Sequence, residues 1–403
     1  MKEKIMTIIT PMLQRIRRID YIMFYNYYKV KESVNNNKVL MLSDSRASLS
    51  GNLKYIYDEL INYDYTINVL LNKFIKDKKS FKDKKKLMYE IATSKYIIID
   101  DFYPIIYPLK LRRDVKLIQV WHAMGAFKKM GFSRIGKPGG PVSTSLTHRN
   151  YTDAIVSSFS IRKDYAEAFG ISISSVHATG IPRTDMFFDK DIINSKKEEL
   201  YKRYPVLKNK KVITYAPTFR GRGQQTAYFD TSIIDFDLLK KELSDDYVFV
   251  IKMHPFVKNA VIPTDEFFID LSDEREINDL LLITDVLITD YSSVIFEYSL
   301  LNKKMIFYVP DIDDYIDKRD FYYPFEKYIY GDVAKSTNEL VSCINKEFSG
   351  NDKIEEFKEF FCSACDGKST KRFVEELIIK NRWYYVYYFK DRGIFNEYFI
   401  FII

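Results

Sequence analysis

The stretch VLITDYSSVIFEYSLL, residues 286–301, decides how the rest of the sequence is interpreted. Its first half is a short apolar run that ends at Asp290, as expected of a strand buried on both faces. After Ser292 and Ser293 the apolar residues take the spacing of one helix face. A strand that leads directly into a helix is the repeating unit of a doubly wound α/β sheet. The N–H groups at the helix start are either capped by the serine hydroxyls or free to bind an anion such as phosphate.

The same alternation of short apolar runs and helical segments fills two successive blocks of the chain. Such runs, bounded by polar turns, are typical of a parallel sheet covered by helices on both faces. The first block predicts strands at 39–43, 66–71, 96–100, 116–121, 154–158 and 175–180. The second predicts strands at 212–218, 247–255, 267–271, 286–290 and 304–310, with helices at 236–243, 275–283 and 293–301. We therefore predict an α/β fold of two doubly wound parallel-sheet lobes that face each other across a cleft.

This pattern divides the chain into four parts. Residues 38–190 form a first lobe, residues 191–382 a second lobe, and residues 383–403 an aromatic tail whose role stays open. Residues 1–37 mix Lys and Arg with Ile, Met, Phe and Tyr, so this segment either lies in an anionic membrane interface or packs as a helix on its own domain. No run of about 18 uncharged apolar residues occurs, and we expect no segment to span a bilayer.

Composition restricts the function. The 403 residues include 62 Lys and Arg against 55 Asp and Glu, a net charge of +7. This surplus suits anionic ligands or an anionic membrane face but is too small to indicate nucleic-acid binding. Three cysteines do not form a disulfide framework, and we expect Cys362 and Cys365 to be structural thiols in a reducing compartment.

The polar residues of interest lie at predicted strand ends, where doubly wound sheets bind their ligands. Two of the four histidines, His122 and His254, follow strands of opposite lobes. A single histidine at a strand end is most often structural, but a pair in facing lobes, flanked by Gly, Pro, Lys and Arg, favours catalysis. The acid pair Asp100-Asp101 lacks D-x-D spacing, so we expect no metal site there.

Several segments resemble the CDP-glycerol glycerophosphotransferase family of teichoic-acid polymerases and primases. They are QVWHAMGAFKKMGFSRIGKPGGP, ATGIPRTDMFF, ITYAPTFRGRGQ, IKMHPFV and ITDYSSVIFEYSLLNKKMIFY. The chain is most similar to the catalytic part of the poly(ribitol-phosphate) polymerases. The resemblance implies a GT-B-like fold and transfer of a polyol phosphate from CDP-glycerol or CDP-ribitol to an undecaprenyl-diphosphate-linked acceptor, with release of CMP. It places the protein peripherally on the cytoplasmic face of the cell membrane, and it implies no cofactor and no metal.

The resemblance also implies roles for individual residues. His122 would be the general base for the acceptor hydroxyl, and His254 would contact the diphosphate and stabilise the departing CMP, although the two roles are interchangeable. Further substrate-binding candidates are Ser292, Ser293, Asp290, Glu297, Thr218, Arg220, Arg183, Lys252 and Gly125.

For several of these residues a structural role competes with ligand binding. Ser292 and Ser293 would hold the diphosphate, and Asp290 orients their turn. Glu297 either binds a ribose or forms a cap or ion pair, and Arg183 either binds phosphate or forms a salt bridge between the lobes.

Two other classes of function remain open. One is a nucleotide-sugar glycosyltransferase or epimerase of GT-B architecture, and the other is a non-catalytic partner in a cell-wall assembly complex. The sequence also leaves open glycerol or ribitol, primase or polymerase, and wall teichoic acid or capsule.

Overall fold

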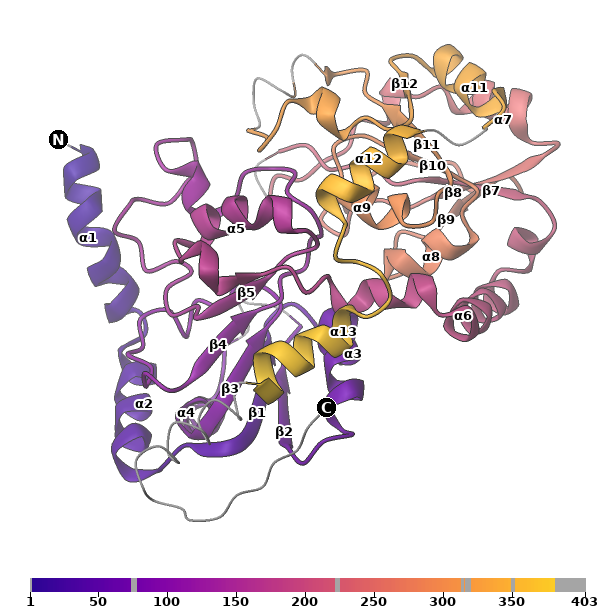
Figure 1. Cartoon of the computed structure of the whole chain (residues 1–403). Coiled ribbons are helices and arrows are strands. Elements are labelled where there is room, and N and C mark those ends of the chain that lie inside the picture. Colours follow the sequence, from indigo (N-terminus) through magenta and orange to yellow (C-terminus); the bar gives the residue numbers. More distant parts are fainter. Residues whose placement is uncertain are drawn as a thin grey trace.

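The structure is a computed structural model that describes residues 2–73, 78–221, 225–312, 315, 320–348 and 352–380. The predicted aromatic tail, 383–403, lies outside the described residues. Figure 1 shows two α/β lobes, with the C-terminal helices running between them.

The first lobe is built on a parallel sheet of six strands in the order β2-β1-β3-β4-β5-β6. The strands are β1 Asn35–Ser43, β2 Thr66–Leu71, β3 Ser94–Ile99, β4 Lys116–Gln119, β5 Asp153–Ile155 and β6 Val176–His177. Its helices include α2 Ile19–Lys31, α3 Gly51–Leu60, α4 Phe81–Thr93 and α5 Arg162–Phe169. The central strands β1 and β3 are buried over almost their whole length because helices cover both faces, as their continuous apolar runs predict.

The second lobe repeats this design with the strand order β12-β11-β10-β7-β8-β9. The strands are β7 Lys211–Tyr215, β8 Tyr247–Ile251, β9 Phe268–Asp270, β10 Val286–Thr289, β11 Lys304–Tyr308 and β12 Asp332–Ala334. The helices are α6 Lys190–Arg203, α7 Phe236–Leu243, α8 Ile277–Ile283, α9 Val294–Ser299 and α11 Thr337–Asn345. The predicted fold of two doubly wound parallel-sheet lobes is confirmed.

The division at residue 382 needs a correction. After α12, Asp352–Phe361, the chain returns to the first lobe through α13, Ser369–Phe373, and the π-helix Val374–Ile379 (Figure 1). Phe373 and Leu377 pack in one core cluster with Val39, and the Tyr96 hydroxyl donates a hydrogen bond to the Ile378 carbonyl at 2.9 Å. The second lobe is therefore not the contiguous segment 191–382, because its last helices belong to the first core.

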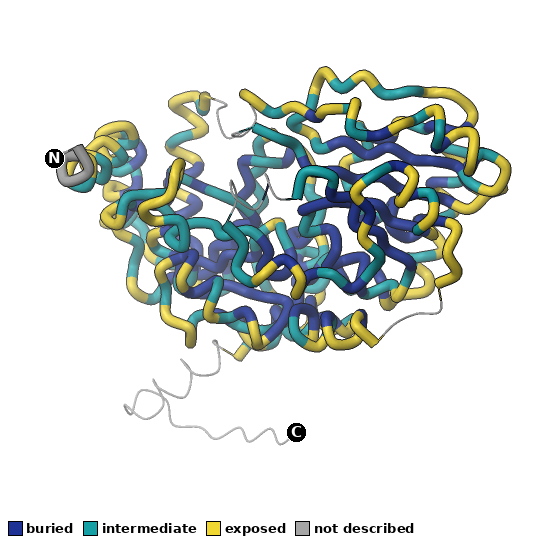
Figure 2. The backbone as a smooth tube through the Cα atoms, turned by 90° about the horizontal axis from the view of Figure 1, so that it is seen from above, coloured by how far each residue is buried: buried dark blue, intermediate teal, exposed yellow. Residues whose placement is uncertain are grey.

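The N-terminal segment divides into two helices with different environments. Tyr21 and Tyr25 of α2 are buried in the first core, so the packing alternative holds for this helix. In contrast, α1, Lys2–Ile16, lies on the outside of the lobe with its apolar side chains largely exposed (Figures 1 and 2). Among the described helices, none combines the length and apolarity that crossing a bilayer requires.

The two lobes are in direct contact. The loop after β4 pairs with a loop of the second lobe, where the Lys129 N–H donates to Asp320 O at 2.8 Å and the Tyr322 N–H to Phe127 O at 3.0 Å. One hydrophobic cluster runs through both lobes and contains Phe127 and Phe296. This packing fixes how the carboxyl ends of the two sheets face each other.

Candidate active site

The strand order of each sheet locates the site. In the first sheet the order reverses between β1 and β3, and in the second between β10 and β7. Ligands of doubly wound folds bind at such switch points, beyond the carboxyl ends of the strands. The segments after these four strands, and after the adjacent β4 and β8, hold most of the predicted site residues.

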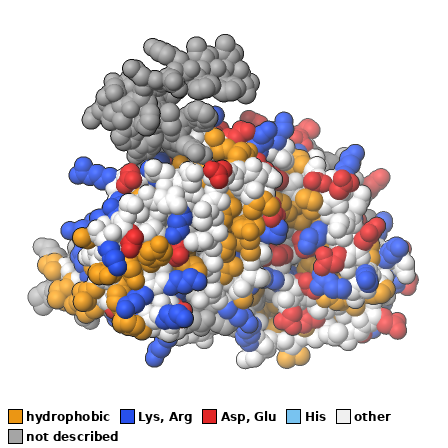
Figure 3. Space-filling view, turned by 90° about the horizontal axis from the view of Figure 1, so that it is seen from below, with side chains coloured by type: hydrophobic (Ala, Val, Ile, Leu, Met, Phe, Trp, Pro, Cys, Tyr) orange, Lys and Arg blue, Asp and Glu red, His pale blue; other side chains and the backbone are white. Residues whose placement is uncertain are grey.

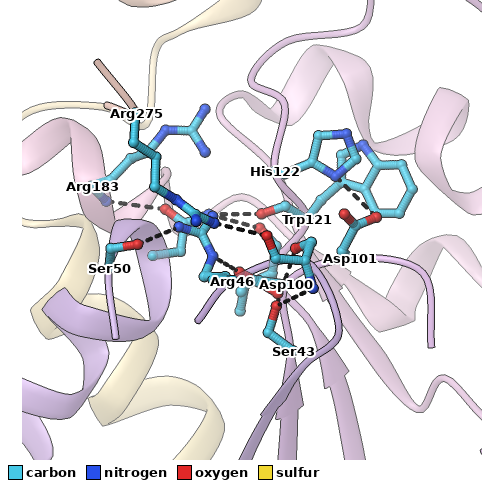
Figure 4. A network of polar contacts seen from close by, with 12 residues as sticks. Ser43, Arg46, Ser50, Asp100, Asp101, Trp121, His122, Arg183 and Arg275 are labelled. Atoms are coloured by element: carbon cyan, nitrogen blue, oxygen red, sulfur yellow. Dashed lines mark hydrogen bonds and ion pairs between the residues drawn. The ribbon is translucent and has the colours of Figure 1, made fainter. Parts of the chain in front are cut away.

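His122 stands just beyond β4 and is paired with a carboxylate. Its Nδ1 lies 3.3 Å from Asp101 Oδ1, and its side chain is 47% exposed (Figure 4). Burial raises the pKa of Asp101, but the hydrogen bond and charge of His122 outweigh burial and leave this pKa lowered. Because a carboxylate only accepts hydrogen bonds, Nδ1 carries the proton in the neutral ring, and Nε2 then has a free lone pair. His122 therefore has the form of an oriented general base.

His254, in the loop after β8, has the opposite arrangement. Its Nδ1 accepts a hydrogen bond from the Phe256 N–H at 3.1 Å, so in the neutral ring Nε2 carries the proton and is a donor. Its ring lies 4.7 Å from those of Phe219 and Phe256. Burial, followed by the positive charges of Lys128, Lys252 and His122, lowers the pKa of His254 to about 4.

The lowered pKa of His254 has causes in both lobes. Lys128 and His122 belong to the first lobe, yet the charge of Lys128, and that of His122 when it is protonated, act on an imidazole of the second. These side chains therefore lie near one another across the boundary between the lobes.

Lys128 is a functional candidate that the sequence interpretation missed. Its Nζ lies 5.3 Å from the Tyr315 ring centroid, and no carboxylate among the described residues pairs with it. Its backbone forms an antiparallel bridge with Phe321, which holds it against the second lobe. A cation near the His254 imidazole, with no carboxylate partner among the described residues, attracts an anion. The basic pair Lys128-Lys129 shortly after His122 was the available signal.

Asp290 organises the site from the second lobe. Its carboxylate accepts hydrogen bonds from the Thr218 N–H at 2.8 Å, the Thr218 hydroxyl at 3.0 Å and Arg220 Nη1 at 3.0 Å. These contacts join the loop after β7 to the loop after β10. The expected orienting role of Asp290 agrees with this arrangement.

Arg220 is largely neutralised by the protein itself. Its Nε and Nη2 donate to the two carboxylate oxygens of Asp311 at 2.8 and 3.1 Å, and Nη1 contacts Asp290 and Thr218. Of five guanidinium hydrogens, one on Nη2 has no partner among the described residues. Arg220 therefore has capacity for one hydrogen bond to a ligand.

The serines of the opening stretch lie just beyond this cluster and remain partly exposed. Ser292 Oγ accepts the Val294 N–H at 3.4 Å, whereas Ser293, at the N-cap position of α9, makes no side-chain capping bond. A plain helix cap accounts for only one of the two hydroxyls. The Ser293 hydroxyl has no hydrogen-bond partner among the described residues, so it is available to a ligand.

Three predicted substrate-binding residues have structural roles within the protein. Arg183 Nη2 donates to Glu297 Oε1, and both side chains are nearly buried, so the salt bridge between the lobes is the alternative that the structure shows. Gly125 has φ +69°, and a Cβ there would lie 2.5 Å from the Phe296 ring. Lys252 Nζ is buried and donates to the Ser272 carbonyl at 2.9 Å. Each of these residues therefore has a structural role beside any contact with a substrate.

Asp100 precedes the Asp101 that pairs with His122, and it forms an ion pair with Arg46. It binds Arg46 Nε, while Arg46 Nη1 contacts Ser50 Oγ at 2.7 Å and Glu276 of the second lobe at 3.4 Å (Figure 4). Across the described part of the chain, no cluster of three or more His, Cys, Asp or Glu side chains is arranged to hold a metal ion.

A surface pocket of about 270 Å³ lies away from the histidines, where α12 leads back toward the first lobe. Its lining includes Phe188, Leu300, Lys358 and Cys362. It contains none of the predicted site residues, so pocket volume alone does not locate this site.

The fold and the site define a GT-B-like protein of two facing doubly wound lobes. The family model described as CDP-Glycerol:Poly(glycerophosphate) glycerophosphotransferase matches residues 23–379, and the chain belongs to this family. The recognition made from the sequence motifs is confirmed.

Individual relatives agree with this assignment. The chain is 50% identical to the teichoic acid poly(ribitol-phosphate) polymerase of Bacillus spizizenii over 372 residues, which are 90% of this chain and 60% of that protein. It is 44% identical to the teichoic acid ribitol-phosphate polymerase TarK of Staphylococcus aureus, over 88% of this chain and 70% of that protein. A solved structure of the wall teichoic acid polymerase TagF superposes with a TM-score of 0.75 at 24% identity, covering 94% of this chain and 99% of that chain, which supports the fold.

Proposed function

We propose that the protein transfers ribitol phosphate from CDP-ribitol to a lipid-linked polyol acceptor in teichoic acid synthesis, with release of CMP. The observation that carries this proposal is the opposite hydrogen bonding of the two histidines. His122 offers a lone pair from one lobe, and His254 offers an N–H from the other. Ribitol is favoured over glycerol because the two relatives described above are both named for ribitol phosphate.

The reaction follows from this geometry. His122 Nε2 takes the proton of the acceptor hydroxyl, whose oxygen attacks the β-phosphorus of CDP-ribitol. A new P–O bond forms to the acceptor, and the bond between the β-phosphorus and the bridging oxygen breaks. CMP leaves with that oxygen and its electron pair. The negative charge that develops on the departing phosphate is stabilised by hydrogen bonds and cations rather than by proton transfer.

His254 is suited to the donor role. With a pKa of about 4 it is neutral near pH 7, and its Nε2–H points away from the bond that Nδ1 accepts. Lys128, the hydroxyls of Ser292 and Ser293, and the remaining Arg220 hydrogen supply further positive charge and donors for the diphosphate.

The acceptor lipid and the membrane are finer parts of the proposal. Helix α1 is held to the first lobe by Gln14, which donates to Ser145 Oγ at 3.1 Å and accepts the Leu146 N–H at 2.8 Å. Figure 3 shows hydrophobic side chains gathered at the end of the molecule where α1 and α2 lie, with Lys and Arg around them. The exposed apolar residues of α1 are Met6, Ile8, Ile9, Met12, Leu13 and Ile16. A basic, apolar helix face binds an anionic bilayer, so we propose that α1 brings the first lobe to its lipid-linked acceptor at the cytoplasmic membrane face.

The reaction is tested by CMP release from CDP-ribitol, CDP-glycerol and a UDP-sugar in the presence of a ribitol-phosphate-primed lipid acceptor. We expect CMP from CDP-ribitol, a loss of at least 100-fold in kcat in His122→Asn, and near-normal rates in the control His177→Asn, whose imidazole pairs with Asp153. UDP-sugar turnover without CMP would support a glycosyltransferase or epimerase instead. Full cellular function of His122→Asn would favour a non-catalytic partner.

Membrane contact is tested by co-sedimentation with vesicles of phosphatidylglycerol and phosphatidylcholine. Ile8 and Met12 are 74% and 59% exposed, and we expect Ile8→Asp/Met12→Asp to lower vesicle binding at least tenfold. Val261, 84% exposed on the second lobe, is the matched control, since Val261→Asp adds a charge away from α1. Equal binding by all three proteins would remove α1 from the proposal.

A further inference from the structure

The segment that carries His122 has a strained backbone. Trp121 adopts φ +49°, the left-handed region, which is strained for a bulky side chain and persists only where neighbouring groups enforce it. Its indole ring lies 4.5 Å from the His122 ring, so the Trp121 conformation sets the direction in which His122 points (Figure 4).

Two buried side chains hold this peptide from both ends. The Trp121 N–H donates to Gln119 Oε1 at 2.8 Å, and the Trp121 carbonyl accepts from Asn52 Nδ2, also at 2.8 Å. Asn52 Nδ2 donates as well to the Val120 carbonyl at 3.0 Å, and Asn52 Oδ1 accepts the Arg183 N–H at 3.1 Å. The strained residue is therefore fixed by amide groups that are themselves fully engaged.

Gln119 also binds the backbone of Asp101, whose carboxylate pairs with His122. Gln119 Nε2 donates to the backbone carbonyl of Asp101 at 3.1 Å and to the Tyr151 hydroxyl at 2.9 Å. Because the Trp121 N–H requires an acceptor and the Asp101 carbonyl requires a donor, the amide has only one allowed orientation. Gln119 is completely buried at the end of β4.

We propose that Gln119 is a positioning residue for the transfer reaction, because one amide ties the segment of His122 to the segment of Asp101 and so sets the imidazole tautomer and direction. Gln119 acts through its neighbours and does not contact the substrate. Its loss would remove the partners of the Trp121 N–H and of the Asp101 carbonyl, and would free the Trp121 peptide to relax toward an unstrained conformation.

The buried tyrosines beside Gln119 provide a matched control. The Tyr107 hydroxyl lies 2.8 Å from the Tyr151 hydroxyl and accepts the Tyr103 N–H at 3.1 Å, but it contacts neither Trp121 nor Asp101. Tyr107→Phe removes a buried hydrogen-bonding group from the same network and lowers stability without loosening the base. Gln119→Leu and Gln119→Glu remove the bond from Gln119 to the Asp101 carbonyl and so loosen the His122 segment directly. Gln119→Glu keeps both the side-chain length and the acceptor for the Trp121 N–H.

The test uses ¹⁵N-histidine NMR on the full chain, whose four histidines are assigned by single His→Asn variants. The wild type and Tyr107→Phe are expected to show His122 protonated at Nδ1. Gln119→Leu, or Gln119→Glu if the leucine variant does not fold, is expected to show a mixture of tautomers. An unchanged His122 spectrum in the Gln119 variant that folds overturns the proposal.

The kinetic measurement rests on the proposed function, whereas the NMR measurement does not. In CMP release we expect Gln119→Glu to lower kcat at least tenfold, with KM for CDP-ribitol within threefold of the wild type and Tyr107→Phe near normal. Equal kcat values for Gln119→Glu and Tyr107→Phe contradict the positioning role. Absence of CMP release by the wild type itself would refute the proposed function and leave the tautomer result to judge Gln119.

Discussion

The protonation of His254 is the most specific consequence of this site. Lowering the imidazole pKa from 6.5 to about 4 corresponds to roughly 3 kcal/mol against the charged ring. Burial is the largest cause, and the charge of Lys128 is the next. We therefore predict that Lys128→Met raises the pKa of His254. Because burial, the larger cause, remains in this variant, the pKa of His254 should rise but stay below 6.5.

The assay is an NMR titration of ¹⁵N-labelled histidine between pH 3.5 and 8 in wild type, Lys128→Met and Lys129→Met. Lys129 is the matched control because it is the adjacent lysine and does not contribute to the lowered pKa of His254. A wild-type His254 that titrates near 6.5, or equal values for the two lysine variants, would refute the reasoning.

The same lowered pKa has a consequence for stability. The unfolded chain protonates His254 as pH falls below about 6.5, whereas the folded chain does so only near pH 4. The stabilisation is therefore complete above pH 6.5 and decreases as pH falls toward 4, and a His254→Asn variant should lose less stability across this window. Protonation of His254 should reduce CMP release only below about pH 4.

Three further predictions concern stability, each measured by urea denaturation. Arg183→Met should destabilise the fold by about 3–5 kcal/mol because it leaves the buried Glu297 carboxylate unpaired. Adding Glu297→Gln should restore part of the lost stability, and equal stability of the single and double variants would contradict this. Gly125→Ala should cost several kcal/mol because the new Cβ meets an aromatic ring, whereas Gly136→Ala, with a similar φ and open space, should cost about 1 kcal/mol. Burial raises the pKa of Asp153, but its hydrogen bonds, chiefly from a histidine, lower it to about 2. The free energy of unfolding of the wild type should therefore fall by about 2 kcal/mol between pH 4 and 2, and Asp153→Asn should not show this loss.

The strands were largely predictable because each is a local apolar run bounded by polar residues. The prediction of 66–71 coincides with β2, and 236–243 coincides with α7. The short edge strand β12, Asp332–Ala334, was missed because three residues with one buried side chain give no periodic signal. The return of α13 to the first lobe was also missed, since sequence periodicity shows that a helix has an apolar face but not which core receives it.

The site was predictable in outline but not in its contacts. Strand ends identified His122 and His254, since switch-point geometry follows from topology. A salt bridge between the lobes was one alternative for Arg183, but the partners of Arg183 and Gly125 were not predictable because they lie far away in the sequence. Gln119 did carry a signal, a polar side chain inside the apolar run of a central strand, where burial demands hydrogen-bond partners.

The most direct test of the facing histidines is a crystal structure of the wild-type chain with CDP-ribitol and no acceptor. We expect the diphosphate between the lobes, with His254 Nε2 about 3 Å from one of its oxygens. We also expect His122 Nε2 to face the β-phosphorus on the side opposite CMP. A diphosphate bound elsewhere, or a β-phosphorus that only one histidine approaches, would contradict it.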